Sequence, residues 1–253
     1  MRFGVCCSLA EAPAVLDAGF DFVELAAVGF AGMEDAWDPR PYQDVPIECT
    51  NVFFPGSIRL AGLDATDYRP YARRTIERAA AIGVATMVVG SGGSRRAPDG
   101  IDGEAIFIDV CRNLQSIADQ HGLRIAPESL NQSETNVGND LRTLALSLQS
   151  IGVDYTADSY HVLWEWNAAG RPGTISNLWA YQVPIRPRHV HLARLESRSA
   201  PTPDDPELQA FASRLAELGY DGTVSLECSR PDGFDFRQAL RDVKELFGTV
   251  GGA

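Results

Sequence analysis

The amino-acid sequence predicts an α/β protein whose eight strand–helix units close into one (βα)8, or TIM, barrel over residues 1–253. The first observation is the alternation itself, because short apolar runs of strand length are followed by helical patterns along the chain. The second is the length of 253 residues, which is typical of a single barrel of this kind. Repeated βα units also build open sheets, but no Gly-x-Gly-x-x-Gly follows the first strand, which argues against a dinucleotide-binding sheet.

The predicted strands are short, apolar and mostly without alternation of polar and apolar residues. Such runs are typical of parallel strands that are buried on both faces. In chain order the predicted strands are residues 3–7, 22–25, 47–53, 86–89, 124–127, 153–157, 188–192 and 223–226. No linker or change of composition interrupts the series, so we expect a single domain.

The predicted helices follow the strands, and most of them end at a glycine. The helical patterns cover residues 9–18, 67–81, 102–120, 139–150, 174–181, 206–218 and 235–247. Glycine is common just past the end of a helix, and it stands there at Gly19, Gly83, Gly122, Gly152 and Gly219. The second unit is the exception, because after the Gly-rich residues 26–32 we expect only a short, irregular helical or loop segment to about Trp37.

The composition narrows the classes of function. The formal net charge is −12 and no cluster of Lys and Arg is large enough to reverse it locally, so no nucleic-acid partner is expected. The five cysteines are odd in number and form no Cys-x-x-Cys pair, as expected for thiols in a reducing compartment. No apolar stretch approaches the ~20 residues of a membrane helix, and the chain begins with a strand pattern instead of a signal peptide. We therefore predict a cytoplasmic protein without a membrane partner.

Four consecutive strands each deliver a side chain of a type that binds metals. Glu128, Asp158, His191 and Glu227 stand at the ends of predicted strands five to eight. The carboxyl ends of barrel strands meet at one mouth, so we expect these side chains to lie together. Three carboxylates and one imidazole suit Mn²⁺, Mg²⁺ or Co²⁺ better than Zn²⁺, which remains an alternative. Taken singly, a carboxylate after a strand can instead cap the next helix, and a histidine can be a core residue.

Further polar side chains lie near these ligand candidates in the sequence. Asn131 and Glu134 follow the first glutamate by three and six residues, and His161 follows the aspartate by three. We expect them in the loops above strands five and six, where they would face whatever the metal holds. Glu24 ends the second strand on the other side of the mouth, and both a substrate contact and a structural ion pair are open for it.

A glycine-rich segment follows the fourth strand. Residues 89–96 read Val-Gly-Ser-Gly-Gly-Ser-Arg-Arg. Such a loop with two arginines can cradle a phosphate or a carboxylate. A tight turn with two solvated arginines, Arg95 and Arg96, is the alternative.

Four motifs together resemble those of the xylose isomerase-like sugar isomerase/epimerase family. They are Glu-Ser-Leu-Asn-Gln-Ser-Glu at residues 128–134, Asp-Ser-Tyr-His at 158–161, His-Val-His-Leu at 189–192, and Gly-Tyr-Asp-Gly at 219–222 followed by Ser-Leu-Glu at 225–227. The resemblance covers essentially the whole chain and is strongest from Gly83 onward. The superfamily includes ketose 3-epimerases, hydroxypyruvate isomerases, inosose dehydratases and endonuclease IV.

The resemblance implies roles for most of these residues. It implies that Glu128, Asp158, His191 and Glu227 bind one divalent metal, commonly Mn²⁺, and that the two glutamates double as an acid/base pair. It also implies that His161 and Glu134 hold substrate oxygens. The sequence departs from the epimerase pattern in one place. An arginine is expected six residues after the ligand histidine, but Ser197 stands there, and a one-residue insertion would give that role to Arg198.

The expected function is that of a divalent-metal-dependent sugar isomerase or epimerase in carbohydrate metabolism. Such an enzyme removes a proton alpha to a carbonyl and passes through a metal-stabilised cis-enediolate. The expected substrate is a small sugar or polyol derivative. A lyase acting on an inosose or dehydroshikimate-like substrate is the main alternative, because it begins with the same proton abstraction. A sugar-binding subunit without catalysis is a further alternative, and barrels of this family commonly form homo-oligomers.

Overall fold

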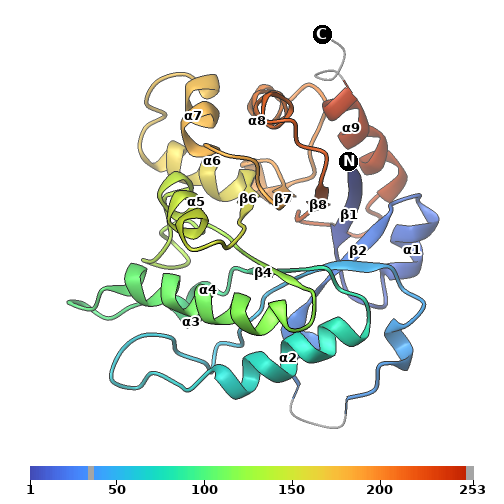
Figure 1. Ribbon diagram of the computed structural model, residues 1–253. Coiled ribbons are helices and arrows are strands. Elements are labelled where there is room, and N and C mark those ends of the chain that lie inside the picture. The colour runs from blue at the N-terminus through green and yellow to red at the C-terminus, as the bar shows by residue number, and fades with distance from the viewer. Residues whose placement is uncertain (34–36, 249–253) are drawn as a thin grey trace.

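A sheet of eight parallel strands forms the centre of the computed structural model, which describes residues 1–33 and 37–248 (Figure 1). Neighbouring strands follow the order β5-β4-β3-β2-β1-β8-β7-β6. The strands are β1 Arg2–Cys6, β2 Phe22–Ala26, β3 Ile47–Asn51, β4 Thr86–Val89, β5 Arg124–Pro127, β6 Thr156–Asp158, β7 His189–Leu192 and β8 Thr223–Leu226. The predicted (βα)8 fold is confirmed, because the strands alternate with helices and the sheet curls into a nearly closed barrel.

The barrel closes between β5 and β6. A single parallel bridge joins Glu128 to Thr156 there. The Thr156 hydroxyl adds a hydrogen bond of 3.0 Å to the carbonyl of Ala126. One of the predicted metal ligands therefore also belongs to the seam of the barrel, so its backbone is held by the closure of the fold.

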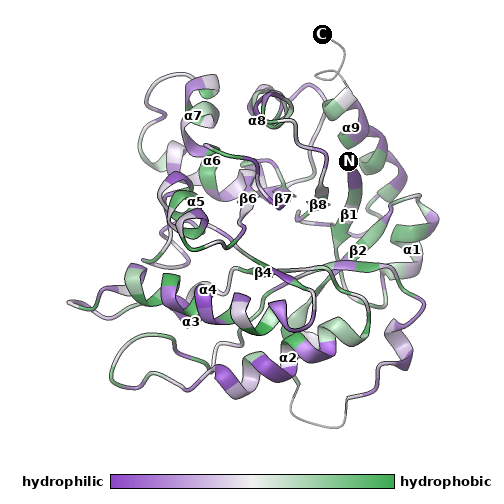
Figure 2. Ribbon diagram, viewed as in Figure 1, coloured by the Kyte–Doolittle hydropathy of each residue, from purple (hydrophilic) through white to green (hydrophobic). Residues whose placement is uncertain are grey.

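The helices surround the strands (Figure 1). They are α1 Ala12–Asp17, α2 Arg69–Ala81, α3 Gly92–Arg95, α4 Gly103–Asp119, α5 Leu141–Ser150, α6 Ser159–Ala168, α7 Ile175–Gln182, α8 Pro206–Glu217 and α9 Phe236–Gly248. In α2, α4 and α9, hydrophobic and hydrophilic residues occur together, as expected when one face packs on the barrel and the other meets solvent (Figure 2). In the described part of the chain, no helix combines the length and the apolar character needed to cross a membrane.

Local sequence explains where the longer helices begin and end. The side chain of Asp102 accepts a hydrogen bond from the backbone of Ala105 and starts α4. Asp140 does the same for Thr143 at the start of α5. Gly122 follows the end of α4 with a φ of 72°, a left-handed conformation that glycine adopts without strain. These helix boundaries agree with the predicted ones to within two residues.

The second unit agrees with the expected short, irregular segment, because its described residues contain only two 3₁₀ turns, Ala27–Gly29 and Arg40–Tyr42. Residues 34–36 of that segment lie outside the described residues. Two other parts of the chain differ from the prediction. Residues 159–168, predicted as loop, form helix α6, which begins directly after the strand because Asp158 caps it. The glycine-rich segment contains the short helix α3. In both cases the helix follows the strand so closely that no turn or loop residues mark its start in the sequence.

Candidate functional site

Four metal-type side chains meet at the carboxyl end of the barrel. Glu128 follows β5, Asp158 ends β6, His191 lies in β7 and Glu227 follows β8. One ligand atom of each lies within 4.8 Å of those of the others. The imidazole is central, because Nδ1 of His191 is 2.7 Å from Oε1 of Glu128 and 3.1 Å from Oε2 of Glu227. The fold thus brings together the four residues that the strand ends indicated, and we call them the ligand cluster.

Asp158 divides its two oxygens between the fold and the ligand cluster. Its Oδ1 accepts a hydrogen bond of 2.6 Å from the backbone N–H of Tyr160 and caps α6. Its Oδ2 is buried and has no hydrogen-bond partner among the described residues. The nearest cations and donors to Oδ2 are Nη2 of Arg198 at 3.5 Å and Nε2 of His161 at 3.6 Å. The helix-cap and metal-ligand interpretations of Asp158 are therefore compatible, because they use different atoms.

The charges of the ligand cluster favour a bound cation. Burial and the neighbouring charge of Glu128 raise the pKa of Asp158 well above its usual range. Burial also opposes ionisation of Glu128, but the charge of His191 lowers the pKa of this glutamate to about 2. A divalent cation would satisfy the unpartnered Oδ2 and offset the repulsion between carboxylates. The residues present therefore fit one divalent metal ion.

Glu24 lies beneath the ligand cluster and not at the mouth. Its side chain is fully buried, and its two oxygens lie 2.9 Å from Nε2 of His189 and 3.0 Å from Nε2 of His191. Burial opposes ionisation of Glu24, but the charge of His191 and hydrogen bonds from both histidines hold its pKa well below the usual range. Both oxygens are occupied by the two histidines, and a substrate contact of Glu24 stays a prediction. The ion pair, the other interpretation of Glu24, describes what the structure shows.

Arg198 reaches the ligand cluster from the segment that follows β7. Its Nη2 lies 2.6 Å from Oε2 of Glu227, and its Nε donates to the carbonyl of the same residue at 3.1 Å. Its guanidinium carbon lies 4.7 Å from the centre of the Tyr160 ring. Ser197 and Arg198 have φ values of 54° and 48°, a conformation that is costly for residues other than glycine and is frequent at functional sites. Arg198 therefore lies at the side of the cluster, where a substrate contact remains a prediction.

His161 is held next to the ligand cluster by Asn131. The backbone N–H of Asn131 donates to Nδ1 of His161 at 3.2 Å, and the side-chain amide nitrogen lies 2.9 Å from the same atom. Burial lowers the pKa of His161 to about 4, so the ring is neutral. Because Nδ1 accepts the hydrogen bond from Asn131, the proton of the ring lies on Nε2. The amide oxygen of Asn131 accepts a hydrogen bond of 3.1 Å from the backbone of Ser133. Asn131 therefore positions His161, and a substrate contact of its own stays a prediction.

Glu134 stands at the outer side of the same group. Its Oε1 lies 3.9 Å from Nδ1 of His161, and its side chain is 41% exposed. Partial burial raises the pKa of Glu134 above its usual range. The carboxyl group therefore reaches both solvent and the neighbourhood of His161, and its substrate contact stays a prediction.

A cavity of about 390 Å³ opens beside the ligand cluster. Its lining includes Asn51, Arg198, Glu227 and Arg230. Asn51 donates a hydrogen bond of 3.2 Å from its amide nitrogen to Oε1 of Glu227. We call this space the mouth cavity, and its volume lies within the ~300–1,000 Å³ typical of small-molecule sites.

A second cavity of about 370 Å³ lies at the opposite end of the barrel. Its lining includes Thr86 and Thr223, the first residues of β4 and β8. In barrels of this kind, chemistry is found at the carboxyl ends of the strands and the amino ends serve stability. We therefore assign the functional site to the mouth cavity and the adjoining ligand cluster.

The glycine-rich segment after β4 does not present two arginines to solvent. Arg95 is buried, and its Nη1 donates a hydrogen bond of 2.8 Å to the backbone carbonyl of Glu128. Its guanidinium carbon lies 4.7 Å from the centre of the Phe107 ring, and burial lowers its pKa to about 10. Arg96 alone is exposed. The expectation of two solvated arginines is thus wrong for Arg95, which supports the backbone of a ligand residue.

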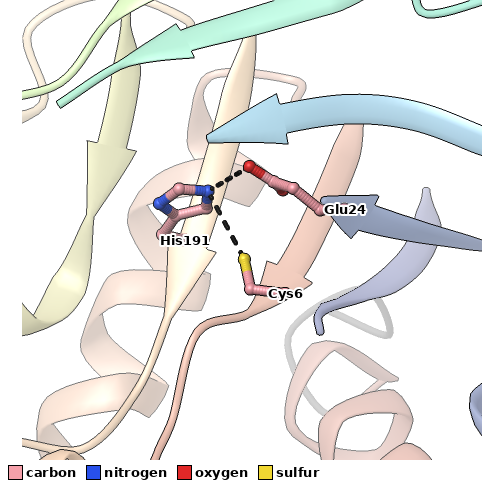
Figure 3. Close-up of side chains that lie close together, drawn as sticks. All are labelled: Cys6, Glu24 and His191. Atoms are coloured by element: carbon pink, nitrogen blue, oxygen red, sulfur yellow. Dashed lines mark hydrogen bonds and ion pairs between the residues drawn. The ribbon is translucent and has the colours of Figure 1, made fainter. Parts of the chain in front are cut away.

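Two residues next to the ligand cluster were not predicted from the sequence to have a role of their own. His189 lies one pleat below His191 on β7 and shares Glu24 with it. The alternation of side chains along a strand was a usable signal, since residues two apart face the same side. Cys6, whose Sγ is 3.9 Å from Nε2 of His191, gave no signal beyond its place at the end of β1 (Figure 3).

Comparisons with known proteins agree with this fold. A family model described as "Xylose isomerase-like TIM barrel" matches residues 13–246. The apo structure of 3-keto-D-glucoside 4-epimerase from E. coli is 18% identical with a TM-score of 0.74, over 95% of this chain and 98% of that chain. The structure of L-ribulose 3-epimerase is 16% identical with a TM-score of 0.74, over 99% of this chain and 94% of that chain. The search among curated proteins gives no significant match.

Proposed function

Because the chain belongs to the xylose isomerase-like TIM barrel family, we propose that it is a divalent-metal-dependent sugar isomerase or epimerase. The observation that carries the proposal is the ligand cluster, whose four ligand atoms lie within 4.8 Å of one another beside the mouth cavity. The similar structures support the substrate class, because their names are those of a keto-glucoside epimerase and a ketose epimerase. The proposed substrate is accordingly a small sugar that carries, or can form, a carbonyl group.

The residues that would hold the metal are Glu128, Asp158, His191 and Glu227. Three oxygen donors and one imidazole favour Mn²⁺, and Mg²⁺, Co²⁺ and Zn²⁺ are the competitors to be tested. When bound, the metal would polarise the substrate carbonyl and offset the negative charge that develops there after proton loss.

Glu128 and Glu227 are the proposed acid and base. Their carboxylates flank Nδ1 of His191, and only Glu227 lines the mouth cavity. We assign one carboxylate oxygen to removal of the proton alpha to the carbonyl, and the other carboxylate to return of a proton on the opposite face or at the neighbouring carbon. Arg198 and Asn51 both donate to Glu227, so they hold its carboxylate toward the cavity.

His161, Glu134 and Arg198 are the proposed substrate contacts. The neutral ring of His161 has its Nε2 proton available, because Asp158 at 3.6 Å is too far for a hydrogen bond. That proton can be donated to a substrate hydroxyl or carbonyl oxygen. Glu134 is exposed enough to accept a hydrogen bond from a further hydroxyl group.

A deuterium-exchange screen tests the proposed function. The protein is loaded with Mn²⁺ and incubated in D₂O with a panel of ketoses, inososes and hydroxypyruvate, and mass spectrometry measures deuterium in the recovered sugar. We expect exchange at one carbon next to the carbonyl for at least one member, and none for the Asp158→Asn variant. An ultraviolet-absorbing enone product would instead identify the dehydratase alternative. Sugar binding without any exchange would identify a binding protein and contradict the proposal.

A further inference from the structure

Glu24 connects two histidines of β7 across the interior of the barrel. It comes from β2, which is separated from β7 by β1 and β8 in the sheet. Its Oε1 lies 3.0 Å from Nε2 of His191, and its Oε2 lies 2.9 Å from Nε2 of His189. All three side chains are completely buried. Figure 3 shows the carboxylate and the thiol of Cys6 on the same side of the His191 ring, away from its second nitrogen.

We propose that Glu24 is a positioning residue that holds the Nε2 proton of His191, so that Nδ1 is the nitrogen that gives up its proton and binds the metal. The proposal rests on the metal site of the proposed function. An ionised carboxylate only accepts hydrogen bonds, so the nitrogen that faces it must carry a proton. A neutral imidazole has one N–H, and Nδ1 of His191 is the atom that faces Glu128 and Glu227.

The second histidine holds the carboxylate in place. Nε2 of His189 binds the other oxygen of Glu24, and Nδ1 of His189 lies 2.7 Å from the hydroxyl of Thr223. The two imidazole rings are 4.9 Å apart and almost perpendicular, at 88°. The carboxylate is therefore fixed from both sides, and the ring of His191 has one orientation that satisfies it. Partners of this kind commonly set the tautomer and orientation of metal-binding histidines.

Cys6 competes weakly for the same nitrogen. Its Sγ lies 3.9 Å from Nε2 of His191, whereas the carboxylate oxygen of Glu24 lies at 3.0 Å. A charged acceptor at the shorter distance forms the stronger hydrogen bond. Replacement of Cys6 by Ala is thus the matched control, because it removes a neighbour of the same ring nitrogen without removing its acceptor.

Two replacements of Glu24 should differ in a defined way. Glu24→Leu removes the acceptor, so His191 loses the partner of Nε2. Glu24→Gln keeps one acceptor and adds one donor, so one of the two histidines must present an unprotonated Nε2 to the amide group. His189 can do this, because its Nδ1 can then donate to Thr223. We expect the amide oxygen of Gln to face His191, because the metal binds Nδ1 of this ring and the proton must therefore stay on Nε2.

The experiment combines metal titration with nitrogen NMR of the histidine rings. Calorimetric titration should show Mn²⁺ affinity about 10–100-fold weaker in Glu24→Leu, little changed in Glu24→Gln and unchanged in Cys6→Ala. In the Mg²⁺-loaded wild type, the NMR spectrum should show His191 protonated at Nε2 alone. In Glu24→Gln, His189 should shift its proton to Nδ1 while His191 keeps its own on Nε2.

Each outcome is informative. Wild-type Mn²⁺ affinity in a folded Glu24→Leu variant, or a proton on Nδ1 of His191 in the loaded wild type, would overturn the proposal. If Glu24→Leu does not fold, the Gln variant decides, because a proton shift in His191 instead of His189 would contradict the role of Glu24. A wild-type protein that binds no metal would refute the proposed function, and the NMR comparison of wild type and Gln variant would still test whether Glu24 holds the Nε2 proton.

Discussion

Replacement of Asp158 by Asn separates the two tasks of this side chain. Asn retains an oxygen that can accept the 2.6 Å hydrogen bond from Tyr160, so the cap of α6 is kept. It replaces the unpartnered Oδ2 by an amide nitrogen, which does not bind a cation. Burial and Glu128 raise the pKa of Asp158, so the folded protein holds this proton more tightly than the unfolded chain. The ionised carboxylate of Asp158 therefore destabilises the metal-free fold at a pH above its raised pKa. Because Asn cannot ionise, the Asn variant should be at least as stable as the metal-free wild type at pH 7.

The thermal stabilities of the wild type and the Asn variant should differ once metal is added. A ligand at 100 times its Kd stabilises a fold by about 2.7 kcal/mol, and about 1 kcal/mol shifts the Tm of a domain of this size by about 2–4 °C. Scanning calorimetry with Mn²⁺ at 100 times the wild-type Kd should therefore raise the wild-type Tm by about 5–10 °C and leave the variant unchanged. Asp158→Ala also loses the cap, so it should unfold about 2–4 °C below the Asn variant without metal. An equal Mn²⁺-dependent rise in the Asn variant would refute the ligand assignment.

The remaining predictions concern proton transfer, substrate contact and the barrel seam. Glu128→Gln and Glu227→Gln should each lower the deuterium-exchange rate of the best substrate by about 10²–10⁴-fold, and wild-type exchange in either variant would contradict the acid/base assignment. Arg198→Lys keeps the charge but loses the guanidinium fork on Glu227, so steady-state kinetics should show kcat/KM reduced by about 10–100-fold. Unchanged kinetics would contradict a role of Arg198 in the functional site. Thr156→Val loses the hydrogen bond to Ala126, so thermal unfolding should show a Tm about 2–4 °C lower, and an unchanged Tm would mean that the seam does not depend on this bond.

Local patterns were sufficient for most of the fold because helix and strand boundaries depend on neighbours in the sequence. Helix α4 begins at the cap residue Asp102 and ends before Gly122, and both signals are readable without a structure. Helix α6 was missed because the residue that caps it, Asp158, also ends the preceding strand. A strand that passes directly into a helix leaves no turn residues to mark the change.

The sequence by itself was sufficient to predict that the four residues of the ligand cluster lie together. Parallel barrel strands bring their carboxyl ends to one mouth, so Glu128, Asp158, His191 and Glu227 had to meet once the strands were identified. No such rule predicts which side chains meet inside the barrel below that mouth, and only the tertiary structure showed the partners of Glu24. Its two partners lie 165 and 167 positions away in the chain, on a strand that is not its neighbour in the sheet. A contact between side chains that cross the barrel interior is set by packing and charge in three dimensions, so no local pattern of residues records it.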